Sequence, residues 1–334
     1  LFTSADPVVI GLWTEVVMIA GAAAALLGLT WMLSGSVPLA CAAGLAILLY
    51  PVSIVLMLPV GGEPAALFAF IAGIFPVLRG GRMLYAGAGV LALVPMARPE
   101  FAILPFTLAV AAVLVVRRAG VWRLVFNRST VLAAALFFAP LSAWLVHNYF
   151  VFGRFPVMAP AVQGETFYGC YNTLTANSLE YWGYWVPPET LPGEQPKSLL
   201  AKRMASELEL SDYYHARGME FIRNNWFSLP RLIVGRFNRA FVPVPWRPWL
   251  PSYAASLCRV LLDVMFLLSL RRSWPVICPL FKVFWVGTFL VVLTTTTLYW
   301  GNFRFVYPLE ILMIPFVAVA VARLRAPLVR AASA

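Results

Sequence analysis

Long apolar runs constrain this chain more than any other feature. Many of its runs approach the roughly 20 helical residues that are needed to cross about 30 Å of hydrocarbon. Charged residues make up only 12% of the 334 residues and hydrophobic residues 61%, whereas soluble domains carry roughly 25% charged residues. The runs therefore predict an all-α polytopic membrane protein with the lipid bilayer as its first partner.

The apolar runs predict about nine transmembrane helices. Several runs are shorter than a full span, so tilted helices are expected and the ends are loosely defined. The predicted spans cover residues 11–33, 37–58, 65–78, 82–97, 101–116, 129–147, 255–270, 275–298 and 306–324.

Basic residues gather in the connections on one side of the predicted bundle, without any acidic residue among them. Cytoplasmic loops carry such an excess of Lys and Arg. These connections are therefore predicted to be cytoplasmic, and the opposite loops extracytoplasmic. The net charge of +11 then follows from topology and requires no nucleic acid as a partner. The residues concerned are Arg79, Arg82, Arg117, Arg118, Arg123, Arg128, Arg271, Arg272, Arg323, Arg325 and Arg330.

The same orientation places Leu1 outside. Because the chain starts there without Met, we expect at least one span upstream. Three parts follow along the sequence: N-terminal spans in 1–147, an external mixed loop and helical region in 148–253, and C-terminal spans in 254–334.

The external region divides into a loop-like stretch from Gly153 to Pro196 and two helical patterns over 198–225 and 228–242. The second pattern is amphipathic, as in a helix that lies on a membrane surface. Packing against the spans and contact with lipid headgroups both remain open. Its apolar set is Leu232, Ile233, Phe237 and Phe241, and its basic set is Arg231, Arg236 and Arg239.

Charged and polar residues collect at the external ends of the predicted spans. Such residues are costly near a membrane and often functional. We expect an external cavity, covered by residues 148–253, to gather them. The set comprises Glu63, Arg98, Glu100, His147, Asn148, Arg154, Arg304, Tyr307 and Glu310.

Each of these residues also has a structural interpretation. Arg98 and Glu100 can pair with each other, and Glu63 before Pro64 is typical of a carboxylate on a helix N-terminus. Arg304 can bind a lipid-linked phosphate through its planar guanidinium, or extend to the interface as an anchor. His147 is more typical of an interfacial histidine than of a ligand.

Other patterns argue against metal or nucleotide sites. The chain has 2 His and 4 Cys, and their positions show no zinc-ligand spacing. No glycine-rich nucleotide motif is present. Asp263 follows Arg259 by one helical turn, which predicts a neutralising ion pair within a span.

Short motifs follow one another along the chain. GEPAALFAF precedes ARPEF by about 35 residues, and WLVHNYFVFGRFPVMAP, GETFYGCYNTL and NFRFVYPLEILMIPFVAVAVARL come later. In this order they resemble polyprenyl-phosphate-sugar-dependent glycosyltransferases of the GT-C superfold. The protein O-mannosyltransferase and lipid A aminoarabinose transferase types are the nearest in pattern.

The resemblance implies an inverting transfer of a sugar from polyprenyl phosphate to a hydroxyl of a lipid, glycan or protein. It implies the bacterial inner membrane and an extracytoplasmic active site, and it leaves a divalent metal open. Asp6 lacks the acidic motif expected for the catalytic Asp, so the general base is expected upstream of Leu1. His147 stands where the family has Arg. Donor-phosphate contact is implied for Arg98, Arg154 and Arg304, and a role in the sugar or acceptor pocket for Glu63, Glu165, Tyr171 and Asn172.

Two other classes of function remain open. A transporter or flippase for lipid-linked glycans would need polar groups that reach both faces, whereas the candidates here lie on one. A catalytically silent scaffold of envelope assembly would fit a chain without the catalytic Asp.

Overall fold

The computed structural model of this chain describes residues 7–53, 62–116, 127–155, 160–204, 206–242 and 250–332. Every regular element within these ranges is a helix. Among the described residues, 5 helices are long and apolar enough to cross a membrane, and they indicate an integral membrane protein. Nine spans remain a prediction. The five helices cover Val8–Ser34, Arg128–Phe152, Tyr253–Ser273, Pro279–Leu298 and Phe303–Leu324.

The chain forms two compact units. Unit 1 comprises Leu1–Leu141, Val244–Val291 and Tyr307–Ala334, and unit 2 comprises Ser142–Pro243 and Val292–Val306. The predicted division at 148 and 253 differs from these limits, because 292–306 belongs with the central segment. The difference arises because the connection between the last two spans packs on that segment.

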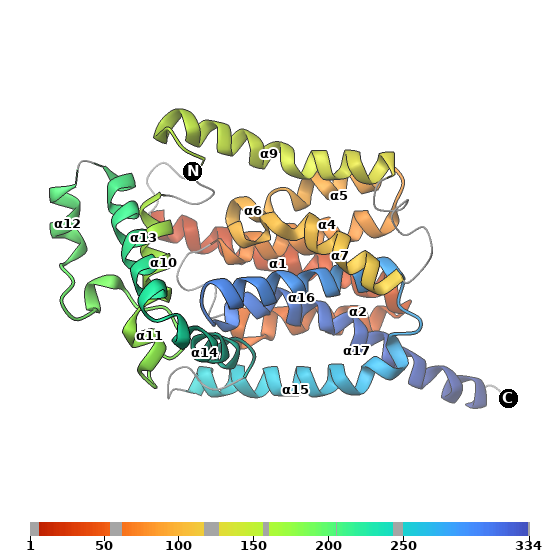
Figure 1. The fold of residues 1–334 in the computed structure, drawn as a ribbon. Coiled ribbons are helices and arrows are strands. Elements are labelled where there is room, and N and C mark those ends of the chain that lie inside the picture. Colours follow the sequence, from red (N-terminus) through yellow and green to blue (C-terminus); the bar gives the residue numbers. More distant parts are fainter. Residues whose placement is uncertain are drawn as a thin grey trace. The chain divides into compact units, whose positions relative to one another are not determined.

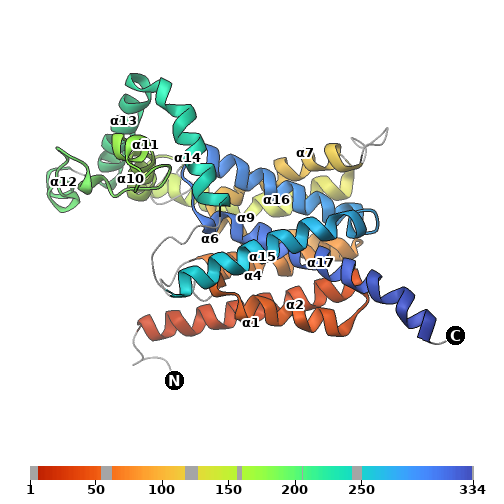
Figure 2. The same cartoon turned by 90° about the horizontal axis from the view of Figure 1, so that it is seen from below.

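Unit 1 contains the apolar helices. Helix α1 packs against α2 and α4, and α4 packs against α5 (Figures 1 and 2). The elements are α1 (Pro7–Ser34), α2 (Val37–Leu49), α4 (Glu63–Arg79), α5 (Met83–Leu91), α6 (Val94–Ala97), η1 (Pro99–Ile103), α7 (Leu104–Val116) and α15 (Leu250–Ser273), with parts of α9 (Arg128–Phe152), α16 (Pro279–Leu298) and α17 (Phe303–Ala332).

Two predicted spans of unit 1 differ from the observed helices. The span predicted over 82–97 corresponds to an apolar helical stretch, Met83–Ala97, in which a turn at Ala92 and Leu93 separates α5 from α6. Pro95 lies in the first turn of α6, and its missing N–H would break a continuous helix there. The span predicted over 37–58 has a helix at Val37–Leu49, while its end from residue 54 lies outside the described residues.

Helix α15 shows how the apolar helices divide their two faces. Its outer stripe consists of aliphatic residues, with Leu268 71% exposed. The inner stripe of the helix is buried: Arg259 is 4% exposed and Ser269 is 6% exposed. A water-soluble helix buries its apolar stripe and exposes its charges, so this arrangement fits a lipid environment. The outer stripe is Leu257, Leu261, Val264 and Leu268.

Unit 2 contains more helix than the sequence predicted. The loop predicted from Gly153 to Pro196 is wrong over α10 and α11, where α10 packs against α13. Gly164 permits this contact, because a Cβ there would lie 2.0 Å from the Ser211 carbonyl oxygen. The elements are α10 (Pro160–Cys170), α11 (Thr173–Asn177), η2 (Pro188–Thr190), α12 (Lys197–Arg203), α13 (Glu207–Asn224), η3 (Trp226–Ser228) and α14 (Leu229–Phe241).

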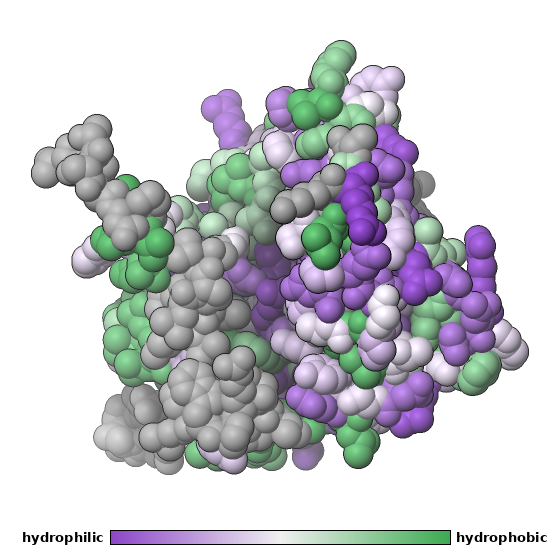
Figure 3. All heavy atoms as spheres, turned by 90° about the vertical axis from the view of Figure 1, so that its left-hand side faces the viewer, coloured by the Kyte–Doolittle hydropathy of each residue, from purple (hydrophilic) through white to green (hydrophobic). Residues whose placement is uncertain are grey.

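Residues 292–306 complete the core of unit 2. Trp300 and Phe305 belong to the same buried cluster as Tyr171 and Leu232. The backbone N–H of Gly301 donates to the carbonyl oxygen of Gly183 at 2.8 Å. The surface around this core is mixed, and hydrophilic residues (purple) gather over the face seen in Figure 3.

Candidate functional site

Three charged residues of unit 1 form what we call the Arg98 cluster: Glu63, Arg98 and Glu100. Glu63 begins α4, Arg98 separates α6 from η1, and Glu100 follows Pro99 in η1. The Arg98 guanidinium donates to the Glu63 carboxylate at 3.0 Å and from Nε to Glu100 at 2.6 Å. Their side chains are only 10–15% exposed. The cluster therefore brings together residues of two sequence motifs, and carries one more negative than positive charge.

Glu15 of α1 lies beside this cluster and was missed by the sequence analysis. Gly21 lies against Phe68 and Gly28 against Phe75; both pairs are 47 positions apart, so α1 and α4 run parallel. This register sets Glu15 opposite position 62, next to Glu63, and the two carboxylates interact electrostatically.

The environment of Glu15 is unusual for a carboxylate. Its side chain is 7% exposed, and its Oε2 atom has no hydrogen-bond partner among the described residues. A single acidic residue inside an apolar run is a sequence signal for function, and applying that rule to residues 11–33 would have identified it.

Tyr307, a predicted site residue, belongs to a separate buried network in unit 1. Its hydroxyl shares a hydrogen bond with Ser53, and its ring stacks on Tyr50 at 5.9 Å. Tyr50 donates to Glu310 at 2.8 Å, and Arg259 donates to the other Glu310 oxygen at 2.6 Å. The Glu310 and Arg259 side chains are 1% and 4% exposed. This network links helices of the apolar unit and holds the Tyr307 side chain in a buried position.

Arg236 of α14 corrects the interpretation of the amphipathic helix. The sequence placed it on the polar face, but its side chain is 1% exposed. It donates to the carbonyl oxygens of Thr297 at 2.6 Å and Cys170 at 3.0 Å, and its guanidinium lies 4.4 Å from the Tyr171 ring centroid. The prediction failed because these acceptors come from distant segments, which no local pattern reveals. Tyr171 is thereby fixed, and also donates to the Leu298 carbonyl oxygen at 2.5 Å.

Arg304 lies in the same unit, at the start of α17. Its guanidinium carbon is 4.6 Å from the Trp300 ring centroid and 5.5 Å from that of Phe305. A cation over an aromatic face is held in a defined orientation, and the planar fork of a guanidinium is the geometry that suits a phosphate.

The other predicted residues of unit 2 are dispersed. His147 is exposed and stacks on Trp144, whereas Asn148 is buried. The exposed Arg154 pairs with Asp212 at 2.7 Å. Glu165 pairs with Lys197. The structure does not gather these side chains into one site.

A polar cavity of about 250 Å³ in unit 2 was also missed. Glu194 lies beside it and is 2% exposed. Burial raises the pKa of this carboxyl, but donors from Tyr168, Arg217 and Tyr213 outweigh burial and hold the pKa below its usual value. The lining residues are Tyr168, Asn172, Thr173, Leu191, Pro192, Arg217, Glu220, Phe221 and Asn224.

Asn172 is the one predicted site residue at this cavity. Its side-chain oxygen accepts from Thr175 N at 3.0 Å, and its amide donates to the Tyr168 and Gly169 carbonyl oxygens. It therefore begins α11 as an N-cap. This engagement makes it a structural wall of the cavity.

Comparisons with protein-family models, curated proteins and solved structures found no match. Among the described residues, no group of three or more His, Cys, Asp or Glu side chains could hold a metal ion. Asp6, with which the catalytic motif was compared, lies outside the described residues.

Proposed function

We propose that this protein is a membrane glycosyltransferase, which moves a sugar from a polyprenyl-phosphate carrier to a hydroxyl group of a lipid, glycan or protein. The Arg98 cluster carries the proposal. Two motifs that are distant in sequence, GEP and ARPEF, contribute Glu63, Arg98 and Glu100 to one partly buried site. The order of the later motifs supports the same family resemblance.

The chemistry assigns different tasks to the two kinds of charge. Inverting transfer needs a carboxylate to take the acceptor proton and positive charge to stabilise the leaving phosphate. Within unit 1, Arg98 can supply positive charge, and the two carboxylates beside it hold its guanidinium in place. Arg304 stays a separate prediction for phosphate contact, with its guanidinium carbon 4.6 Å from the Trp300 ring centroid. Glu15 adds a buried oxygen that can accept a hydrogen bond from a hydroxyl.

The membrane topology forms part of the proposal. The five long helices would be joined by spans built from α2, α4, α5 with α6, and α7, giving nine in all. The basic connections would face the cytoplasm. The reaction would then take place on the extracytoplasmic side of a bacterial inner membrane.

A transfer assay tests the proposal. The full-length protein is reconstituted in liposomes with undecaprenyl phosphate linked in turn to labelled mannose, glucose, galactose or an amino pentose, with membrane extracts as acceptor. We expect a labelled glycoside and free undecaprenyl phosphate. Glu63→Gln should lower the rate roughly 100-fold, because Arg98 loses one of the two carboxylates that position it. Glu207→Gln, at an exposed carboxylate of α13, is the matched control.

The alternatives give different results in the same assay. Movement of the labelled lipid between leaflets without a glycosidic product would identify a flippase. Neither movement nor product with any donor would favour a scaffold. Either result overturns the proposal.

A further inference from the structure

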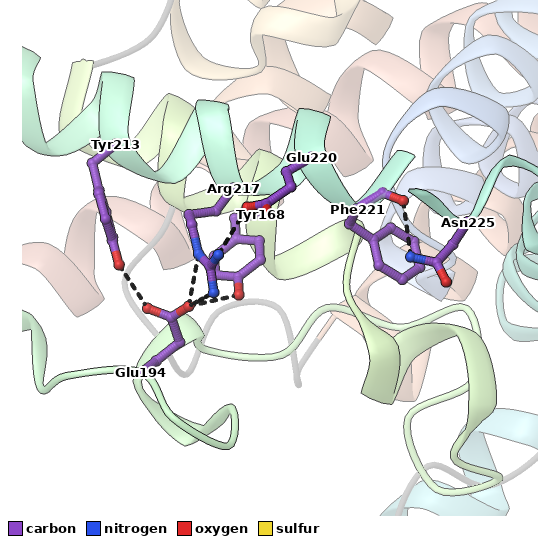
Figure 4. Close-up of polar contacts among 7 residues, drawn as sticks. All are labelled: Tyr168, Glu194, Tyr213, Arg217, Glu220, Phe221 and Asn225. Carbon is purple, nitrogen blue, oxygen red and sulfur yellow. Dashed lines mark hydrogen bonds and ion pairs between the residues drawn. The ribbon is translucent and has the colours of Figure 1, made fainter. Parts of the chain in front are cut away.

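The cavity in unit 2 has a prearranged polar wall. Glu194 accepts hydrogen bonds from the Tyr168 hydroxyl at 2.8 Å, from the Tyr213 hydroxyl at 3.1 Å and from Arg217 at 2.9 and 3.1 Å. Figure 4 shows these donors converging on one carboxylate, with Tyr213, Arg217 and Glu220 projecting from α13. Four donor contacts to a carboxylate that is 2% exposed fix the loop after η2 against α10 and α13. The wall is thus set before any ligand arrives, which lowers the entropic cost of binding.

The charges of this wall disfavour an anion. Arg217 binds Glu194 and also pairs with Glu220 at 2.8 Å. Two carboxylates therefore surround one guanidinium, and the pKa of Arg217 is raised, first by its hydrogen bond to Glu194. A phosphate or sulfate would have to displace a carboxylate and meet a second one. The local net charge thus favours a neutral or cationic ligand.

The remaining groups of the cavity match a polyhydroxyl ligand. Thr173 and Asn224 are exposed, and no side-chain hydrogen bond engages either of them within the part of the chain that the structure describes. A hydroxyl and an amide can each donate and accept, and Glu220 keeps a free acceptor capacity. Tyr168 and Phe221 supply aromatic carbon to the same lining. Apolar rings with a few polar groups are typical of small-molecule sites.

We propose that this cavity binds one neutral sugar residue of a glycan. Its hydroxyls would bond to Thr173, Asn224 and Glu220, and its C–H face would lie against Phe221. The volume of about 250 Å³ is below the roughly 300–1,000 Å³ typical of pockets for drug-sized ligands, and this size suits a single sugar ring. The site goes beyond the proposed transfer reaction, because binding here needs neither the donor lipid nor the Arg98 cluster.

Saturation-transfer NMR on the detergent-solubilised full chain tests this site. The probes are the methyl glycosides of mannose, glucose, galactose and N-acetylglucosamine, with inorganic phosphate as the anionic comparison. We expect at least one glycoside to bind with a Kd in the millimolar range, typical of a weak single-ring ligand. Asn224→Ala should weaken that binding about fivefold, the effect of one hydrogen bond. Thr173→Val should weaken it by a similar factor.

Asn177→Ala is the matched control. Asn177 is an exposed amide on α11 that does not line the cavity, so its replacement should leave binding unchanged. Circular dichroism of each variant checks that the helices are retained.

Three results overturn the proposal: no binding by any neutral glycoside, equal binding by the wild-type chain and Asn224→Ala, or preferential binding of phosphate. The NMR experiment contains no donor lipid. Failure of the transfer assay therefore does not contradict sugar binding in this cavity, and a lack of sugar binding does not contradict the transfer reaction.

Discussion

The two units bury arginine in different ways. In unit 1, Arg259 lies within the apolar helices and meets the Glu310 carboxylate at 2.6 Å. In unit 2, Arg236 is 1% exposed and binds carbonyl oxygens and a tyrosine hydroxyl. No ion pair joins Arg236 to an acidic residue among the described parts of the chain. A buried cation can be stabilised by an opposite charge or by backbone carbonyls: Arg259 in unit 1 has the carboxylate, and Arg236 in unit 2 has the carbonyl dipoles.

The largest effect is expected from breaking the pair in unit 1. Glu310→Leu should lower the free energy of unfolding by about 3–5 kcal/mol, because it leaves the Arg259 charge in a low-dielectric environment. Thermal unfolding in detergent, followed by tryptophan fluorescence, measures the change. The double variant Arg259→Met with Glu310→Leu should recover most of the loss. A single variant as stable as the wild type would contradict the comparison.

A smaller loss is expected in unit 2. Arg236→Met should destabilise by about 2–4 kcal/mol, because the Cys170 and Thr297 carbonyl oxygens lose their donor. The same melts report it. Arg231→Met on the exposed face of α14 should change stability by less than about 0.5 kcal/mol. Equal effects at both positions would mean that the carbonyl contacts contribute nothing.

Replacing Glu63 of the Arg98 cluster and replacing the neighbouring Glu15 should change stability with opposite signs. Glu63→Gln should cost about 1–2 kcal/mol, because Arg98 loses a charged hydrogen bond. Glu15→Gln should raise stability by a few tenths of a kcal/mol, since it removes a buried like charge; residues kept for function often carry such a cost. Urea unfolding in detergent separates the two variants. A loss of stability on Glu15→Gln would identify Glu15 as a packing residue.

The smallest effect concerns pH. The pKa of Glu194 is lower in the folded chain than in the unfolded one. Its contribution to stability is therefore present above the unfolded carboxyl pKa of about 4.3 and is lost as pH falls through the lower folded value. Tyr168→Phe removes one hydrogen-bond donor to Glu194. It should reduce the pH-dependent part of the free energy of unfolding by under about 1 kcal/mol. Melting temperatures from pH 3 to 6 measure it, and identical curves for both chains would refute it.

Sequence patterns predicted the structure correctly where all residues of a segment meet the same environment. The apolar run over 129–147 predicted α9, because hydrocarbon imposes one rule on every residue of a span. The same reasoning failed at Arg236, since its partners lie about 60 positions away in both directions. It failed again for α10, where contact with α13 overrides a glycine-rich composition. The pairing of Arg98 with Glu100 was expected from their closeness in ARPEF and is observed, but the pairing of Arg98 with Glu63 and the Glu194 network depend on a fold that no periodicity encodes.

The interruption of unit 2 in sequence restricts how it can be exchanged between proteins. Residues 292–306 join α16 to α17, yet Thr297 binds Arg236 and Gly301 binds Gly183. A chimera that imports residues 142–243 alone would bring the Arg236 guanidinium but leave its Thr297 acceptor behind in the parent chain. Transfer of unit 2 to another protein should therefore succeed only when residues 142–243 and 292–306 are transferred together. In recombination between related genes, the two segments would have to be retained as a pair.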